Sequence, residues 1–491
     1  MSGELGTEAL NLGFTKSRKL SLKDLETLVD ACIPKTPYEN AVLVIWPAGD
    51  GSWSADFSNQ AGWVKPKKMD LNSFVGRKLR GGGSFGVVYE SKKRPGALVR
   101  KILRPERFIF ERSPAVYTPY TPEDRARCSQ KEQREFWKAA VKEFVGFCSA
   151  YPDAPGHLFQ KLRLEQRADV PSELAEFKSR FCAARMSLQD LGAQNFHQYV
   201  LSQDSLYRSP NRFARHAFIF SVLADVLLQL AALQDPSMPD PSRRRVHLDV
   251  KELNIIIKTN PSGLPSAYLV DFGGSLHPDL CATDTVIRST YSDIRAFILD
   301  QPHHPSADAW SLGVMILSYL SDSSRFNYER DFMDPMTVEK REKAWKPEEL
   351  EALVLLLEGQ FLDKCAQLKR CFLTGDLISG MPLLLREHYE KAIGVIFWLI
   401  DTDREKRMKA SGFAQISEYL KLVGRALWAN KEAFALEAAE SASAGGGGSG
   451  AAGAGAAGRS AYAFSPIKIL KRPRAEDHEK STAPGAKKFE R

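Results

Sequence analysis

The feature that most constrains the fold is a polar loop between two apolar runs, at residues 246–257. It reads Val-His-Leu-Asp-Val-Lys-Glu-Leu-Asn-Ile-Ile-Ile, which places Asn254 five residues after Asp249. A second acid, Asp271, follows one predicted strand later in the segment Val-Asp-Phe-Gly. Metal-assisted phosphoryl transfer requires this set, because one acid can orient an attacking hydroxyl while the amide and the other acid hold Mg²⁺ against a nucleotide triphosphate.

A glycine-rich segment upstream supplies a second part of the same chemistry. Residues 81–88 contain Gly-x-Gly-x-x-Gly-x-Val, with glycines at Gly81, Gly83 and Gly86 and the valine at Val88. Glycine lets the backbone come close to phosphate oxygens, although glycine triplets also form ordinary turns and Rossmann loops. The residues after Gly86 are β-branched and aromatic, which predicts a β-hairpin rather than the helix that a Rossmann loop opens.

The next predicted strand, residues 98–103, carries a lysine. From this strand Lys101 can reach the α- and β-phosphates of a bound nucleotide. A lysine on an edge strand is often only a solvated surface charge. The glycine loop before it favours the phosphate-binding interpretation.

In this order, the glycine loop, the strand lysine, the His-x-Asp loop and the Asp-Phe-Gly segment resemble the protein kinase superfamily. Two later segments resemble it as well: residues 308–313 are similar to the start of its central buried helix, and residues 401–407 to its late Asp-to-Arg segment. The resemblance covers residues 71–428. It implies an α+β, bilobal protein-kinase-like fold, with ATP between a small β-rich lobe and a larger helical lobe.

The resemblance also implies a role for each motif residue. Asp249 is expected to be the catalytic base and Lys251 the charge stabiliser beside it, with Asn254 and Asp271 as Mg²⁺ ligands. A lysine two residues after the base is similar to the serine/threonine branch of the family. The predicted nucleotide-binding residues are Gly81, Gly83, Gly86, Val88, Lys101 and Glu143.

Glu143 is chosen because the family pairs its strand lysine with a glutamate on the one helix of the small lobe. Residues 130–147 have helical periodicity with apolar residues near one face. Glu143 has the best offset within this helix, and Glu135 and Glu132 are alternatives. A solvated helix charge is the simpler interpretation of all three.

Three features depart from the family pattern. Leu248 stands where an arginine usually precedes the catalytic aspartate, which argues against switching by a phosphorylated activation loop. No Ala-Pro-Glu segment occurs between residues 274 and 305; within this range, residues 289–291 resemble a remnant of the family's substrate loop. Residues 321–387 form a long, irregular insertion. These features favour a divergent kinase of the viral, parasite or effector type.

Two other classes of function fit parts of the pattern. A catalytically weak or inactive pseudokinase would act as a nucleotide-binding interaction module, but such proteins usually lack one of the residues Lys101, Asp249, Asn254 and Asp271. Small-molecule phosphotransferases of the aminoglycoside or choline type also use His-x-Asp-x-x-x-x-Asn, but usually lack Phe-Gly after the metal aspartate. The sequence therefore favours a protein serine/threonine kinase that acts on protein substrates.

Composition predicts the domain organisation. Residues 1–70 form an extension, in which residues 41–47 predict a strand that either packs on the small lobe or belongs to a separate docking unit. Residues 71–192 are the predicted small lobe, with a proline-rich loop inserted near residues 104–127. Residues 193–428 are the predicted large lobe.

Three segments within the lobes are assigned only from the order of elements along the chain. Residues 180–185 predict the last strand of the small lobe, residues 186–190 the hinge that faces the adenine, and residues 195–200 the start of the next helix. The apolar run 217–233 is too short and too polar to span a bilayer and predicts a buried helix before the catalytic loop. Residues 386–400 predict a second buried helix.

The end of the chain differs in composition. Residues 441–458 contain only Ser, Ala and Gly, which predicts a flexible linker. Residues 459–491 predict a disordered basic tail, whose 468–474 segment resembles a nuclear import signal; weak contact with nucleic acid is the alternative. The seven cysteines show no zinc-binding spacing and no signal peptide is visible, so an intracellular, reducing location is expected, without a membrane.

Overall fold

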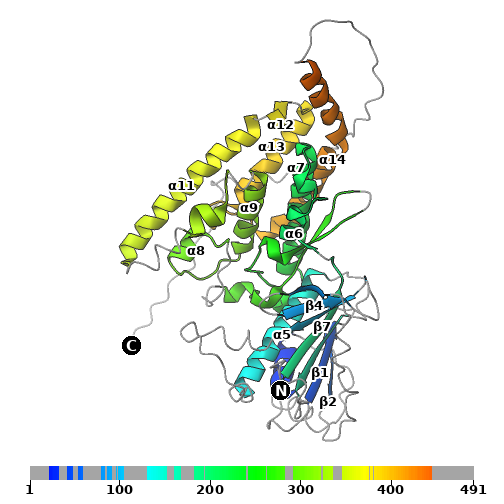
Figure 1. Ribbon diagram of the computed structural model, residues 1–491. Helices are drawn as coiled ribbons and strands as arrows, with labels where there is room; N and C mark the ends of the chain where they lie inside the picture. The colour runs from blue at the N-terminus through cyan, green and yellow to red at the C-terminus, as the bar shows by residue number, and fades with distance from the viewer. Residues whose placement is uncertain are drawn as a thin grey trace. The chain divides into compact units, whose positions relative to one another are not determined.

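Alternating apolar and polar residues produce a seven-stranded antiparallel sheet in the N-terminal part of the chain (Figure 1). In β6, for example, Leu162 and Leu164 are buried whereas Arg163 between them is half-buried. The strand order is β2-β1-β6-β7-β5-β4-β3. The strands are β1 (Ala41–Pro47), β2 (Trp53–Ser58), β3 (Leu79–Gly82), β4 (Gly86–Glu90), β5 (Leu98–Leu103), β6 (Lys161–Gln166) and β7 (Cys182–Gln189).

These elements come from a computed structural model of the chain. It describes residues 22–32, 41–47, 53–58, 79–82, 86–90, 96, 98–103, 130–151, 160–166, 182–192, 194–238, 241–260, 263–281, 291–321, 325–334, 345–374, 376–379 and 381–444. Gly83, the predicted loop at 104–127 and the predicted tail at 459–491 lie outside these residues.

Two helices pack on this sheet. Helix α5 (Gln130–Ala150) buries Phe136, Ala140 and Phe144, which recur at helical spacing, and contacts β6 and β7. Helix α2 (Leu22–Cys32) packs on α5 and β1, where its Asp30 pairs with Arg134 of α5. Because β1 also pairs with β6, residues 41–47 belong to this sheet and not to a separate docking unit.

The predicted strand at 98–103 and the predicted hairpin are confirmed by β5 and by the pair β3–β4. The predicted hinge at 186–190 is wrong in its position. Strand β7 continues to Gln189 because it is hydrogen-bonded to β5 as far as the Leu98–Gln189 pair. The chain therefore leaves the sheet only at Asp190.

The later described residues are mainly helical. The helices are α6 (Phe196–Leu201), α7 (Arg212–Gln234), α8 (Ile294–Ile298), α9 (Ala307–Leu320), α11 (Pro347–Thr374), α12 (Asp376–Ser379), α13 (Leu383–Leu399) and α14 (Phe413–Ala444). Short turns of helix are η4 (Leu206–Arg208), η5 (Pro241–Arg243), η6 (Glu252–Asn254), η7 (Phe272–Gly274), η8 (Pro278–Leu280), η9 (Glu329–Met333) and η10 (Ala410–Gly412). A small sheet has the order β10 (Ser266–Leu269), β9 (Ile255–Lys258), β8 (Gln194–Asn195).

The described part of the chain thus contains antiparallel sheets and, after the larger one, mainly helices. This arrangement confirms the coarse fold class, α+β.

Helix α7 is the centre of this helical part. It is buried along most of its length, which confirms the buried helix predicted at 217–233, and it packs chiefly on α14. A Cβ at Gly424 of α14 would lie 3.2 Å from the carbonyl oxygen of Ala217, so a glycine allows the two helices to approach closely. Among the described residues, α7 is also the one helix whose length and apolar composition would suffice to cross a bilayer.

Two sequence-based boundaries need correction. The region 321–387 is not mainly irregular, because α11 alone takes 28 residues of it. Its buried positions, Val354, Phe361, Cys365 and Leu368, recur at helical spacing. The predicted linker begins too early at residue 441, since α14 continues to Ala444; alanine and serine tolerate a helix, and the glycines begin at residue 445.

Candidate active site

A cavity of about 410 Å³ lies between the seven-stranded sheet and the 249–254 loop. Its walls come from β4, β5, α5, the end of β7, and the loop segments on either side of β9 and β10. The cavity is lined by eight of the predicted site residues: Gly86, Val88, Lys101, Glu143, Asp249, Lys251, Asn254 and Asp271. Gly81 lies in β3, on the other strand of the hairpin.

Lys101 is the electrostatic centre of the cavity. Its Nζ contacts a carboxylate oxygen of Glu143 and lies 3.0 Å from Oδ1 of Asp271. Glu143 is thus the glutamate that reaches the lysine, whereas Glu135 is exposed on the same helix and the side chain of Glu132 lies outside the described part.

The three charges shift one another's pKa. Burial would lower the pKa of Lys101, but Asp271 and Glu143 raise it above its ordinary value. Burial raises the pKa of Glu143 in spite of the opposing effect of Lys101. Burial alone would raise the pKa of Asp271. The positive charge of Lys101, together with His247 and Lys251, outweighs this effect and lowers the pKa of Asp271 below its ordinary value. The lysine is therefore a cation and Asp271 an anion at neutral pH.

A glycine that the sequence analysis missed allows this pairing. Gly146 follows Glu143 on α5, and a Cβ at Gly146 would lie 2.5 Å from Cβ of Phe272. Only a glycine lets α5 come this close to the turn after Asp271. The one signal in the sequence is a glycine in the middle of a predicted amphipathic helix, where it costs stability unless packing requires it.

An aromatic column joins α5 to the 249–254 loop. The ring of Phe272 lies 6.3 Å from that of Phe147 and 5.0 Å from that of His247. Below it, the buried carboxylate of Asp308 accepts the backbone N–H groups of His247 and Leu248, each at 2.7 Å. These contacts hold Leu248 at φ 66°, a left-handed conformation that costs a non-glycine residue about 1–2 kcal/mol.

The loop itself is closed by its own side chains. The amide nitrogen of Asn254 donates to the backbone oxygen of Asp249 at 2.8 Å and to Oδ2 of Asp249 at 2.9 Å. Lys251 Nζ lies 2.8 Å from the same Oδ2. Because the nitrogen of Asn254 is used in this way, its Oδ1 is the atom that remains to act as a ligand.

The far end of the cavity is apolar. Val88, Val99, Leu188, Leu191 and Ile256 line it, as a flat heterocycle would require. The chain leaves β7 beside this wall through Gly192, whose φ is 136° and where a Cβ would lie 2.9 Å from the carbonyl oxygen of Ile257.

An ion pair at this end was not predicted. Arg80, directly before Gly81, lies 3.1 Å from Asp190 and 3.0 Å from Glu90. Asp190 also accepts the N–H of Gly192 at 3.1 Å. The arginine thus ties the glycine hairpin to the segment after β7, and no short motif in the sequence links residues 110 positions apart.

Asp293 was missed by the sequence analysis as well. It caps the N-terminus of α8, is buried, and pairs with Arg404 at 2.9 Å and with Arg407 at 3.3 Å. Burial acts against its ionisation, but Arg407 and Arg404 lower the pKa of Asp293. Arg407, the last residue of the segment 401–407, therefore has an acidic partner, although no Ala-Pro-Glu occurs between residues 274 and 305. The available signal was an acid at the start of a short apolar helix.

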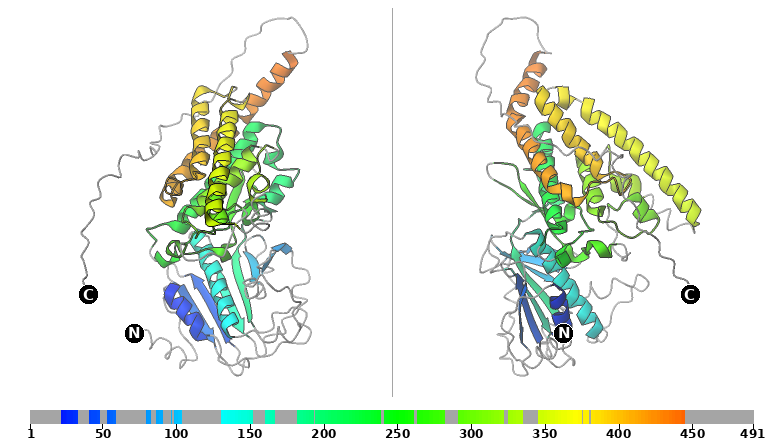
Figure 2. Two further views of the ribbon diagram at one scale, coloured as in Figure 1. Left: turned by 90° about the vertical axis from the view of Figure 1, so that its left-hand side faces the viewer. Right: turned by 180° about the vertical axis from the view of Figure 1, so that it is seen from behind.

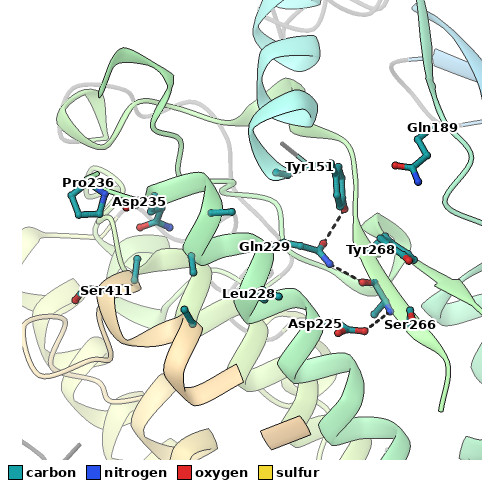
Figure 3. A pocket seen from close by; sticks show the side chains of 17 residues that line it. Tyr151, Gln189, Asp225, Leu228, Gln229, Asp235, Pro236, Ser266, Tyr268 and Ser411 are labelled. Carbon is teal, nitrogen blue, oxygen red and sulfur yellow. Dashed lines mark hydrogen bonds between the residues drawn. The ribbon is translucent and has the colours of Figure 1, made fainter. Parts of the chain in front are cut away.

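A larger cavity of about 790 Å³ lies elsewhere, beside α7 and β10 (Figure 3). Its polar groups already bond to one another: Gln229 donates to the backbone oxygen of Ala267 at 2.7 Å, and Asp225 accepts the N–H of Ala267 at 2.9 Å. Asp225 also pairs with Lys421. These bonds join α7 to β10, and none of the predicted site residues lines this cavity.

No known family model matches the sequence, and no curated protein matches it significantly. Within the described part of the chain, no group of three or more His, Cys, Asp or Glu side chains converges to hold a metal ion. His304, one of two adjacent histidines, lies 3.4 Å from Glu405 instead.

Proposed function

We propose that the chain is an ATP-dependent protein serine/threonine kinase with a bilobal, kinase-like fold. The observation that carries the proposal is the meeting of Lys101, Glu143, Asp249, Asn254 and Asp271 around one cavity. These residues come from four separate segments of the chain. Their chemistry is that of a phosphoryl-transfer site: one cation for phosphates, two oxygen ligands for a metal ion, and one acid beside them.

ATP would enter with its base against the apolar end and its phosphates under the glycine hairpin. Lys101, held by Glu143, would then contact the α- and β-phosphates. The phosphates would offer Lys101 more negative charge than the single carboxylate of Asp271 does. Asp271, which at present pairs with the lysine, would then be available to hold a metal ion.

Mg²⁺ fits the oxygen atoms at the site. It binds through one or two carboxylates with substrate phosphates and water, so it does not need a cluster of three protein ligands. Asp271, ionised by its lowered pKa, and Oδ1 of Asn254 would hold it. When bound, the ion supplies positive charge against the transferring phosphoryl group.

Asp249 would orient the hydroxyl of the substrate. Among the described contacts of its carboxylate, those from Asn254 and Lys251 both fall on Oδ2, so Oδ1 remains to accept the hydroxyl proton. Lys251 would also stabilise charge on the transferring group. Effective transfer requires this alignment before the reaction begins.

The proposal is tested with purified protein, labelled ATP, Mg²⁺ and a generic basic protein substrate. We expect Asp249→Asn to lower the transfer rate about 10²–10⁴-fold while ATP binding persists. Equal turnover by the wild type and by this variant would refute the assignment of the base.

The main alternative is an inactive module that only binds nucleotide. It predicts a rise in melting temperature with ATP and Mg²⁺ but no labelled product from the wild type. A small-molecule phosphotransferase would instead label an aminoglycoside or choline and leave the protein substrate unlabelled. One set of assays therefore separates the three functions.

A further inference from the structure

Within the part of the chain that the structure describes, one long helix presents an apolar stripe that no other element covers. Helix α11 lies on the outside of the helical part: it runs along the edge in Figure 1 and in the right view of Figure 2, and it lies in front in the left view of Figure 2. Leu355, Leu356 and Leu362 on it are 64%, 58% and 50% exposed. Ala352, Gly359 and Ala366 are exposed as well. Residues 352, 355, 359, 362 and 366 have the alternating three- and four-residue spacing of a helix–helix seam.

The stripe is separate from the face that α11 uses within its own chain. That face contains the buried residues Val354, Phe361, Cys365 and Leu368. Gly359 lies in the middle of the helix with nothing within 4 Å of where its Cβ would be. A glycine there costs about 1 kcal/mol relative to alanine, and the described packing gives no reason for it. A second helix that approaches closely would give one.

The distribution of charges along α11 indicates which helix packs on the stripe. The first half of α11, residues 347–358, carries four acids and no base, namely Glu348, Glu349, Glu351 and Glu358. Two of these acids, Glu351 and Glu358, also pair with Arg295 of α8 in the same chain, at 3.1 and 3.2 Å. The second half, residues 359–374, carries Lys364, Lys369 and Arg370 against one acid, Asp363. An antiparallel copy of the same helix places the acidic half on the basic half, whereas a parallel copy opposes like charges. A two-fold axis generates this antiparallel arrangement.

We propose that α11 is the contact surface of a homodimer, in which it packs antiparallel on α11 of a second copy. A register centred between Gly359 and Leu362 places Leu362 on Gly359 of the second copy and Leu355 on its Ala366. The same register places Glu351 near Arg370 of the second copy. Each large side chain then faces a small one, as close helix packing requires.

The dimer is expected to be weak. One pair of helices of this length buries less than the roughly 1,200 Å² that stable complexes use, so the dissociation constant should be on the order of micromolar. Because the stripe contains none of the catalytic residues, this inference does not depend on kinase activity.

Sedimentation velocity of the full chain between about 1 and 100 µM tests the proposal. We expect a concentration-dependent shift from monomer to dimer in the wild type. The double variant Leu355→Glu and Leu362→Glu should remain monomeric with unchanged circular dichroism. Leu201→Glu is the matched control, since Leu201 is 54% exposed on another helix, and it should dimerise as the wild type does.

A second variant separates folding from association. Gly359→Gln should raise the melting temperature of the monomer, because glutamine favours a helix more than glycine does. It should also weaken the dimer at least tenfold, because its side chain fills the place of Leu362 from the second copy. A monomeric wild type throughout the concentration range would overturn the proposal, and so would a dimer that the double variant leaves intact.

Discussion

Single residues with no chemistry of their own decide whether the charged groups of the cavity meet. Gly146 has no polar atom in its side chain, yet its missing Cβ allows α5 to bring Glu143 to Lys101. Gly192 allows the turn out of β7 in the same way. Such residues are difficult to recognise in a sequence, because the atoms that they make room for lie far along the chain.

Replacing Gly146 by alanine tests the role of this close approach. The added Cβ overlaps the side chain of Phe272, so α5 must move away and the contact between Lys101 and Glu143 must lengthen. We expect a loss of about 1–3 kcal/mol in the free energy of unfolding. If the chain is the proposed kinase, kcat/KM for ATP should also fall at least tenfold. Gly394→Ala is the control, because nothing lies within 4 Å of that position in α13. Equal kinetics for the two variants would contradict the role of Gly146.

The site residues differ in how far the sequence could predict them. Asp249, Lys251 and Asn254 are neighbours in the chain, so their spacing alone indicated that they act together. Lys101 and Asp271 were found because each lies in a recognisable local pattern. Asp293 and Arg80 have no such pattern. Only the folded chain brings Arg407 to Asp293 and Asp190 to Arg80, each across about 110 residues of sequence.

Between elements, the contact of α7 with α13 contains a titratable group. His216 is buried on α7, and its Nδ1 lies 3.0 Å from the hydroxyl of Tyr389 on α13. Burial, together with Arg215 and Arg212, lowers the pKa of His216 to about 3. The folded protein therefore keeps this histidine neutral where the unfolded chain, with a pKa of about 6.5, takes up a proton.

This difference predicts that stability falls as the pH drops below about 6.5. His216 should contribute a loss of about 2 kcal/mol in the free energy of unfolding between pH 6.5 and pH 5. Urea unfolding of the wild type and of His216→Gln, measured across this range, isolates the contribution. Parallel curves for the two proteins would show that His216 does not stay neutral in the folded state.

The segment after the Asp-Phe-Gly motif is fixed by apolar contacts. Val246 and Leu276 exchange backbone hydrogen bonds at 2.8 and 3.0 Å, and with Leu248 and Cys281 they form a small buried cluster. In the proposed kinase, Leu248 would occupy the position where an arginine binds a phosphorylated loop in that family. A leucine cannot bind phosphate, and here it packs on the segment directly.

If the chain is a kinase, phosphatase treatment should therefore leave most of its activity. The measurement is the transfer rate of purified protein before and after treatment, with loss of phosphate verified by intact mass. A decrease of more than about tenfold would mean that phosphate, rather than the apolar cluster, orders this segment.

Across the whole molecule, two segments of the predicted N-terminal extension, β1 and β2, are part of the main sheet. Leu43 and Ile45 of β1 are fully buried, and β1 forms ladders with both β2 and β6. The sequence indicated the strand but not its neighbours, because pairing partners of a strand are not encoded within it. Helix α7 could be located from its apolar run and the start of α9 from the motif at 308–313, whereas α11 could not be separated from an irregular insertion by composition alone.

Removal of residues 1–70 should therefore destabilise the entire protein, because it removes two strands of the main sheet. Ile45→Asp, which places a charge in the core, should lower the melting temperature by more than 10 °C or abolish soluble expression, whereas Val44→Asp on the half-buried side should cost far less. Similar melting temperatures for the two variants would argue that β1 is dispensable.

The position of β1 has a consequence for synthesis of the chain. The hairpin β1–β2 leaves the ribosome early, but its neighbour β6 begins only at Lys161, and β7 ends at Gln189. At about 5–20 residues per second the hairpin waits several seconds or more for these strands, and a lone hairpin is at best marginally stable in water. During that interval Leu43 and Ile45 are exposed, so the nascent chain is a natural client for a chaperone that binds short apolar strands.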